Sequence, residues 1–232
     1  MKFSKKAIVV LSGGLDSSVN FLWALTRYQV VRTLTFDYGQ RAALKEMEAA
    51  AAFSKIGGIK HEIIPLPYLS QWTQTSLINK GELIPKLTTK ELDNKRKTKK
   101  SARSVWVPNR NGIFLNISAA LAESLQAPIL VVGFNAEEGA TFPDNSIKFV
   151  KAINDSFFYS TLNHAKVICK TIFMRKTEIV KLGVKLELPF KLLWSCYSGG
   201  KKMCGLCESC LRLKRAVQIS APSKLEILTF AN

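Results

Sequence analysis

The chain has 232 residues, of which 47% are hydrophobic and 22% are charged, a balance typical of a globular domain and unlike that of a disordered chain. No apolar run approaches the roughly 20 residues that a membrane-spanning helix needs, and the run ending at Leu11 is too short for an export signal, so we expect a cytoplasmic protein without a membrane partner. The formal net charge of +17 favours contact with polyanions such as nucleic acids but does not specify a fold.

A phosphate-binding loop is predicted close to the N-terminus. The uninterrupted apolar run Ala7–Leu11 is typical of a strand buried on both faces of a parallel sheet, and a helix-like pattern runs from Val19 to about Tyr28. Between them, two adjacent glycines allow positive φ and let backbone N–H groups converge on an anion, towards which the helix dipole also points. The predicted polyphosphate site consists of Leu11, Ser12, Gly13, Gly14, Leu15, Asp16, Ser17 and Ser18.

The spacing of this loop excludes a Walker-type loop and a dinucleotide fingerprint. It resembles the SGGxDS loop of the ATP pyrophosphatases, which cleave ATP between its α and β phosphates. The resemblance implies that ATP is bound, that pyrophosphate is the leaving group and that Asp16 helps to hold Mg²⁺. The plainer alternative is an ordinary turn in which Asp16 caps the helix.

A second strand is predicted from Val30 to Phe36, and its carboxyl end continues as Asp37–Arg41. Ligands of open α/β sheets bind at such strand ends, so this segment should lie beside the phosphate loop. The letters FDYGQR resemble the second-strand signature of the 7-cyano-7-deazaguanine synthases, one branch of the pyrophosphatases. That resemblance implies that Arg41 lines the shared substrate pocket; without it, Arg41 could be a surface cation.

A helix over Ala42–Lys55 and a strand over Ile59–Leu66 are predicted next. The following segment, about 67–104, has weak periodicity and contains the basic run Lys95–Lys100. We expect this basic insertion to be a mobile lid, or an arm partly ordered by a neighbouring subunit. A solvated loop without a partner is the alternative.

The segment Val107–Asn111 resembles the family's VPxRN motif. Arg110 offers a planar fork of donors that suits a phosphate or carboxylate. Asn111 can cap the helix predicted over Gly112–Leu125 or bind a purine-like edge. The resemblance places Arg110 and Asp144 in the same pocket as Arg41.

The loop after the predicted strand Pro128–Phe134 departs from the family pattern. Phe142 stands where tyrosine is expected, Asn145 where cysteine or threonine is expected, and Glu138 where aspartate is common, while Pro143 and Asp144 remain. These departures affect the predicted identity of the acceptor, the molecule that reacts with ATP, more than the predicted nucleotide chemistry.

The remaining pattern is a helix over 146–162, a strand over 166–173 and a helix over 175–182. The whole order predicts an α/β fold, a Rossmann-like doubly wound parallel sheet of five strands. We place an ATP pyrophosphatase domain at 1–190 and a small C-terminal zinc-binding element with a helix at 191–232.

Four of the five cysteines form the cluster Cys196-x7-Cys204-x2-Cys207-x2-Cys210. In a reducing compartment such spacing favours a metal over disulfides, and four thiolates suit tetrahedral Zn²⁺ with no open position for water. We therefore predict a structural zinc, with an iron–sulfur cluster as the alternative. Cys169 is read as a small buried hydrophobe.

The resemblance covers almost the full chain through four segments in order. It implies a ligase that uses ATP, Mg²⁺ and ammonia to convert 7-carboxy-7-deazaguanine to the nitrile through adenylated acid and amide, in queuosine precursor biosynthesis, as a homodimer. Its catalytic residues would be Asp16, Arg41, Arg110 and Asp144.

Three alternatives stay open. The chain could be a divergent relative that transfers activated deazaguanine to a protein or nucleic acid, another tRNA-modifying ATP pyrophosphatase, or a non-enzymatic zinc-containing RNA-binding module.

Overall fold

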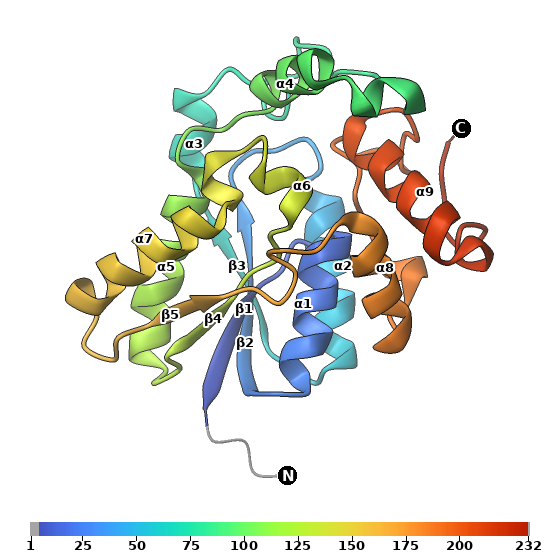
Figure 1. Cartoon of the computed structure of the whole chain (residues 1–232). Helices are drawn as coiled ribbons and strands as arrows, with labels where there is room; N and C mark the ends of the chain where they lie inside the picture. Colours follow the sequence, from blue (N-terminus) through green and yellow to red (C-terminus); the bar gives the residue numbers. More distant parts are fainter. Residues whose placement is uncertain (1–4, 232) are drawn as a thin grey trace.

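Five parallel strands form the centre of the protein in the computed structural model, which describes residues 5–231 (Figure 1). Their order across the sheet is β3-β2-β1-β4-β5, and every neighbouring pair is parallel. The predicted five-stranded, doubly wound α/β fold is thereby confirmed. The strands are β1 (Lys6–Val10), β2 (Gln29–Asp37), β3 (His61–Pro65), β4 (Ile129–Val131) and β5 (Lys166–Ile168).

Helices cover both faces of the sheet (Figure 1). The longer ones are α1 (Leu15–Leu25), α2 (Ala43–Ile56), α4 (Lys95–Ser104), α5 (Arg110–Ser124), α7 (Ile147–Ser160), α8 (Lys176–Lys185) and α9 (Glu208–Ser220). The short ones are α3 (Pro67–Trp72), α6 (Ala136–Gly139) and the 3-10 turns η1 (Thr89–Asp93), η2 (Pro143–Asn145), η3 (Phe190–Leu192) and η4 (Pro222–Lys224).

The two faces of β1 show why its sequence is continuously apolar. Ala7 and Val9 are fully buried in a core shared with α1, α2 and α8, whereas Ile8 is buried in a second core with α5 and α7. Side chains of successive strand residues point to opposite faces, so a strand covered on both sides needs apolar residues at every position.

The strands β4 and β5 are shorter than their sequence patterns predict, since each pairs over only three residues. The residues that follow β4 instead run alongside the phosphate loop. A Cβ on Gly133 would lie 2.4 Å from the backbone nitrogen of Ser17, so this close approach requires glycine. The apolar residues that follow β4 therefore approach the phosphate loop closely.

The basic run does not lie in a loop, because Lys95–Lys100 belongs to α4; a lid or arm role for the insertion stays a prediction. The Asn94 side chain caps this helix by accepting hydrogen bonds from the backbone of Arg96 and Lys97, both at 3.1 Å. Lysine and arginine are good helix formers, but a run of them has no apolar periodicity to reveal a helix.

The insertion packs on the C-terminal element of the same chain. Leu87 donates a backbone hydrogen bond to Leu206 (3.3 Å), and Arg215 forms an ion pair with Asp93 (2.8 Å). The buried cysteines of that element belong to the same core as β1. None of the helices within residues 5–231 combines the length and hydrophobicity needed to cross a bilayer.

Candidate active site

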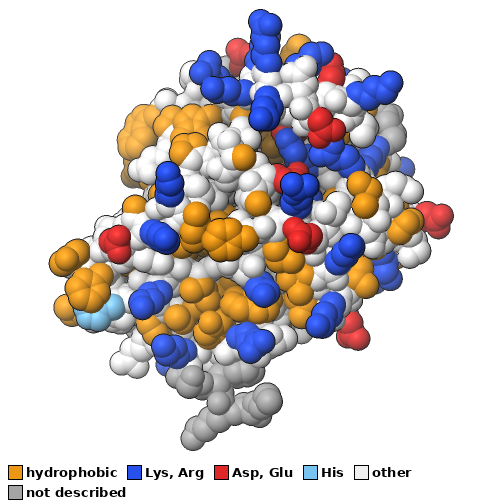
Figure 2. All heavy atoms as spheres, in the orientation of Figure 1, with side chains coloured by type: hydrophobic (Ala, Val, Ile, Leu, Met, Phe, Trp, Pro, Cys, Tyr) orange, Lys and Arg blue, Asp and Glu red, His pale blue; other side chains and the backbone are white. Residues whose placement is uncertain are grey.

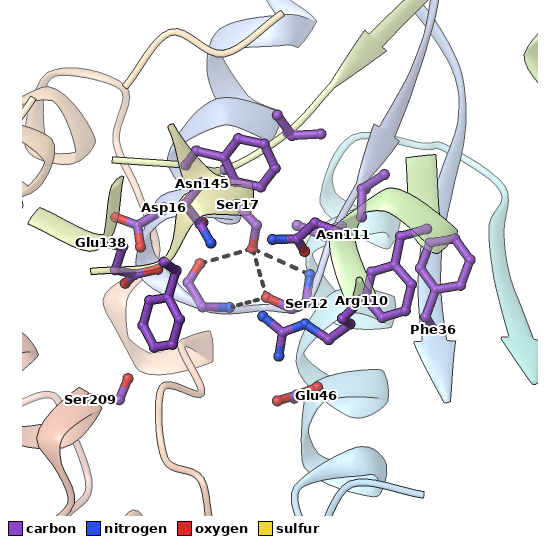
Figure 3. Close-up of a pocket in the computed structure, with 18 of the residues that line it drawn as sticks. Ser12, Asp16, Ser17, Phe36, Glu46, Arg110, Asn111, Glu138, Asn145 and Ser209 are labelled. Atoms are coloured by element: carbon purple, nitrogen blue, oxygen red, sulfur yellow. Dashed lines mark hydrogen bonds between the residues drawn. The ribbon is translucent and has the colours of Figure 1, made fainter. Parts of the chain in front are cut away.

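A pocket opens at the carboxyl ends of β1, β2 and β4 (Figure 3). The phosphate loop forms its floor, and the C-terminal element closes one side with Trp194, Ser195, Tyr197 and Ser209. Charged side chains come from five separate parts of the chain, which makes the pocket suited to a ligand with both phosphate and polar groups. These charged residues are Asp16, Glu46, Arg110, Glu138, Asp144 and Lys176.

The phosphate loop has the conformation that its glycines predict. Gly13 has a φ of +76°, and a Cβ there would lie 2.4 Å from the Cβ of Ala49. The hydroxyl oxygens of Ser12 and Ser17 are 3.1 Å apart, and Ser17 donates to the carbonyl of Gly14 at 3.2 Å. Helix α1 begins at Leu15, so its positive end faces the pocket.

The pocket does not contain every predicted loop residue. Its lining includes Leu11, Ser12, Gly14, Leu15, Asp16 and Ser17 but neither Gly13 nor Ser18. Gly13 accepts a hydrogen bond from Trp194 N–H at 2.9 Å. The Ser18 hydroxyl is buried and has no hydrogen-bond partner among residues 5–231, so it faces the interior instead of the ligand space.

Asp16 lies in an ion-pair network that the linear sequence does not reveal. The ammonium group of Lys176, at the start of α8, contacts the Asp16 carboxylate and lies 2.8 Å from Glu138. Burial raises the pKa of Asp16 to about 6, although Lys176 lowers it. The two carboxylates raise the pKa of Lys176 despite its burial, so the lysine stays charged.

One oxygen of Asp16, Oδ1, is buried without a hydrogen-bond partner in the described chain. Magnesium binds through one or two carboxylates together with substrate phosphates. A carboxylate oxygen left unpaired beside a phosphate loop fits that coordination, so Asp16 is suited to hold Mg²⁺.

The network continues outward to the C-terminal element. Arg212 of α9 pairs with Glu137 at 2.9 Å and with Glu208 at 2.8 Å. Glu137 also accepts a hydrogen bond from the backbone N–H of Lys176 at 2.9 Å. The adjacent acids Glu137 and Glu138 therefore connect the phosphate end of the pocket to α9.

On the other side of the pocket, Arg110 and Asp144 surround a polar recess. Arg110 donates to the Tyr38 hydroxyl at 3.1 Å, and its buried Nε has no partner in the part of the chain that the structure describes. Nearby Tyr38 and Asp144 raise the pKa of Arg110 despite its burial. Asn111 is tied to Asp144 through the Asp144 carbonyl, which accepts from Asn111 Nδ2 at 3.3 Å. The cap of α5 is Asn109, in the left-handed region, and not Asn111.

Arg41 lies outside the pocket lining. Its guanidinium donates to the backbone carbonyls of Asn79 and Glu82 in the insertion. The strand end was correctly expected beside the phosphate loop, but the side chain turns away to hold the insertion.

The four clustered cysteines meet in space. Their sulfur atoms all lie within 4.8 Å of one another, and those of Cys204 and Cys210 are 3.9 Å apart. Four thiolates at 2.3 Å from one zinc ion would be about 3.8 Å apart. Backbone N–H groups of Ser198 and Cys204 point at the Cys196 sulfur at 3.3 and 3.2 Å. This donor set fits a closed tetrahedral metal site.

The family model described as Queuosine biosynthesis protein QueC matches residues 6–220. The chain belongs to the QueC family.

Curated relatives of this QueC-family chain match it over almost their full length. The 7-cyano-7-deazaguanine synthase of Bdellovibrio bacteriovorus is 51% identical over 217 residues, which is 93% of this chain and 94% of that protein. The enzyme of the same name from Carboxydothermus hydrogenoformans is 52% identical over 212 residues, 91% of this chain and 98% of that protein. That from Pelotomaculum thermopropionicum is 50% identical, covering 92% and 96%.

The sequence did not predict two polar residues that line the pocket, Lys176 and Glu46, or Gln40, which holds Glu46 without lining the pocket. Lys176 is the first residue of α8, and Glu46 lies in the first turn of α2. Both helices follow the ends of strands, and Gln40 holds Glu46 by a hydrogen bond. The position of each helix start at the carboxyl edge of the sheet was the available signal, because side chains there face the ligand space.

Proposed function

We propose that this QueC-family chain is an ATP-dependent 7-cyano-7-deazaguanine synthase. One observation carries the proposal: a single pocket joins the phosphate loop and Asp16 to a recess containing Arg110 and Asp144. The chain also shares about half of its residues with synthases of that name. A phosphate site next to a polar recess is what adenylation of a small acceptor requires.

The first half of the reaction activates and replaces the carboxyl oxygen. The carboxylate of 7-carboxy-7-deazaguanine attacks the α-phosphorus of ATP, and the bond to the bridging oxygen breaks, releasing pyrophosphate. Ammonia then forms a C–N bond with the acyl carbon, the C–O bond to AMP breaks, and the nitrogen loses a proton. The product is an amide, so the chain would be a ligase that forms C–N bonds.

The second half removes the amide oxygen. That oxygen attacks the α-phosphorus of a second ATP and displaces pyrophosphate. The nitrogen then loses its protons as the C–O bond to AMP breaks, which leaves the nitrile. Both halves place the α-phosphorus of an ATP molecule beside an oxygen on the same acceptor carbon, so one pocket is sufficient.

Residues on the two sides of the pocket would have different roles, one side binding the polyphosphate and the other the acceptor. The N–H groups and hydroxyls of the loop, with Lys176, would bind the polyphosphate and stabilise charge on the departing pyrophosphate. Asp16 would hold Mg²⁺, which neutralises phosphate charge when bound. The fork of Arg110, which donates to the Tyr38 hydroxyl, would orient the acceptor carboxylate, and the nearby charge of Asp144 would balance the guanidinium.

The four cysteines would hold a structural zinc, because a site with four protein thiolates leaves no position for substrate. A homodimer, which the family resemblance and the long insertion favour, and a cytoplasmic location are further parts of the proposal.

The test is mass spectrometry on purified protein incubated with ATP, Mg²⁺, ammonium and 7-carboxy-7-deazaguanine. The free nitrile and AMP are expected, and Asp16→Ala should abolish both while leaving the zinc content of the cysteine site intact. AMP formation that stops at the adenylate or amide would instead favour a relative with a macromolecular acceptor, which the altered Phe142 and Asn145 positions motivate. Wild-type rates in Asp16→Ala would show that the loop is not the ATP site.

A further inference from the structure

A carboxylate on the first turn of α2 faces the pocket on the side of Arg110. Glu46 lines the pocket together with Phe36, Tyr38 and Arg110. In Figure 3 its carboxyl group lies on α2 below Arg110, whereas Asp16 and Glu138 lie on the other side of the loop. Glu46 is therefore separate from the acids that surround Lys176.

Gln40 holds this carboxylate in place. The buried Gln40 amide accepts a hydrogen bond from the Tyr38 backbone at 2.9 Å and donates to the Phe36 carbonyl at 3.0 Å. The same Nε2 donates to Glu46 Oε2 at 2.9 Å. Because the amide is held at both ends by the strand, it positions the glutamate before any ligand arrives.

Most of the hydrogen-bonding capacity of Glu46 remains unused. Among residues 5–231 it forms no ion pair within 4.0 Å, and Gln40 is the one donor to its side chain. An ionised carboxylate has about four lone-pair sites. Burial raises the pKa of Glu46, and Gln40 and Arg110 oppose that shift. Two further N–H donors from a ligand would satisfy the remaining acceptor sites of this half-buried carboxylate.

The chemistry of the possible ligands distinguishes between them. A phosphate would be repelled by Glu46, and the Watson–Crick edge of adenine presents an acceptor next to a donor. A guanine-type edge presents two adjacent donors, the N1–H and the 2-amino group, which match the two oxygens of a carboxylate. Its O6 acceptor would find a donor in Arg110.

The pocket wall near Glu46 also suits a flat base. Phe36 and Phe114 stack with ring centroids 4.1 Å apart, Tyr38 lies against Phe114, and all three line the pocket. Aromatic side chains of this kind pack against the faces of bases, which leaves the base edges free for polar recognition.

We propose that Glu46 recognises the N1–H and 2-amino edge of the deazaguanine and thereby sets the base specificity of the acceptor site, with Gln40 as its positioning residue. The inference rests on the proposed function, since it names which group of that substrate is recognised.

The experiment compares two substrates: 7-carboxy-7-deazaguanine and the hypoxanthine-type analogue that lacks only the 2-amino group. For each, kcat/KM is measured with wild-type protein and with Glu46→Gln. Wild type should prefer the 2-amino substrate by roughly 10- to 100-fold. In Glu46→Gln this preference should fall to within about threefold, because an amide offers a single acceptor oxygen, while KM for ATP stays unchanged.

Glu48→Gln is the matched control, since Glu48 lies on the same helix but is exposed and pairs with Lys45; it should keep the wild-type preference. Glu46→Asp retains the charge but retracts it, so an intermediate preference is expected, and this variant decides the matter if Glu46→Gln does not fold.

An unchanged preference in Glu46→Gln, or a defect confined to KM for ATP or for ammonium, would overturn the assignment of Glu46. Failure of the proposed function is a different result: wild type would then form no nitrile from either substrate. Calorimetric binding of the two acids to wild type, Glu46→Gln and Glu46→Asp would still report on base recognition in that case.

Discussion

Asp16 is a buried acid and Glu46 a half-buried acid of the same pocket, and their neighbours suit them to different ligands. Asp16 contacts the ammonium group of Lys176, so its charge is balanced and the pair can meet a metal-bound phosphate. Glu46 is held by the neutral amide of Gln40, so its charge remains available to neutral N–H donors. The identity of the neighbour, more than the burial itself, separates the phosphate side from the base side of the pocket.

The surroundings of Glu46 predict a pH-dependent cost in stability. Its pKa in the folded protein is raised above that of an exposed glutamate, mainly by burial. Between the unfolded-state pKa and the higher folded-state pKa, the folded chain therefore binds more protons than the unfolded chain. The destabilisation by Glu46 is fully present above the folded-state pKa and is lost as the pH falls below the unfolded-state pKa. Glu46→Gln should melt at a higher temperature than wild type at pH 7.5.

Near pH 4 the melting temperatures of Glu46→Gln and wild type should converge. Ligand-free protein is used for the thermal melts, and Glu48→Gln should follow wild type at both pH values. A stabilisation by Glu46→Gln that is the same at pH 4 and pH 7.5 would show that the pKa of Glu46 is not raised by folding.

At the scale of elements, the cysteine site connects the last helix to the phosphate loop. Cys207 caps α9, and Cys196, Cys207 and Cys210 are buried in the core that contains β1. The segment entering the site donates from Trp194 N–H to the Gly13 carbonyl at 2.9 Å. A metal that holds the cysteines together would therefore also hold one wall of the pocket.

The cysteines provide an internally controlled test of this role. Cys207→Ser should lower zinc affinity by more than about tenfold, because it replaces one of four thiolate ligands. It should also increase hydrogen exchange in α9 and weaken ATP binding through the Trp194 contact. Cys169→Ser changes a thiol outside the cluster, which donates to the Phe134 carbonyl at 3.2 Å.

Zinc is measured by elemental analysis, and backbone protection by hydrogen exchange. Full zinc content in Cys207→Ser, or equal loss in Cys169→Ser, would contradict a four-cysteine site. Iron in place of zinc would favour the alternative of an iron–sulfur cluster.

On the scale of the whole molecule, the insertion and the C-terminal element lie together above the pocket end of the sheet (Figure 1). Basic side chains gather over α4 in the face shown (Figure 2). They are all exposed, since α4 buries only Thr98, Ser101 and Ala102. Part of the excess positive charge is thus concentrated on the ordered surface of α4. The backbone of the insertion is held by Arg41 and by the C-terminal element.

Arg41 supplies a test of how the insertion is held. Arg41→Gln removes a cation that serves two backbone carbonyls, at Asn79 and Glu82. Local opening of the insertion should become easier by about 1.5–3 kcal/mol, a typical value for hydrogen bonds to a charged group. Hydrogen exchange should accelerate over about 77–93, while KM for ATP changes little because Arg41 does not line the pocket.

Arg96→Gln, on the exposed side of α4, is the control and should leave exchange in that range unchanged. A large rise in KM for ATP in Arg41→Gln, without faster exchange, would restore the role in the shared pocket that the sequence resemblance implies.

Local sequence was sufficient wherever the determining interactions lie within one segment. The apolar run of β1, the glycines of the phosphate loop and the spacing of the four cysteines each encode their own geometry, so the parallel α/β fold, the loop and the cysteine cluster were predictable. The basic run was not, because a helix made of lysine and arginine has no apolar face to show, and its packing partner lies more than 100 residues away in the C-terminal element.

What only the tertiary structure decided is which polar side chains meet. The family resemblance placed Asp16, Arg110 and Asp144 in one pocket, but it could not pair Asp16 with Lys176, 160 residues away, or turn Arg41 towards the insertion. Contacts between distant segments depend on strand order and on where each helix begins. These are properties of the folded sheet, and no spacing along the chain expresses them.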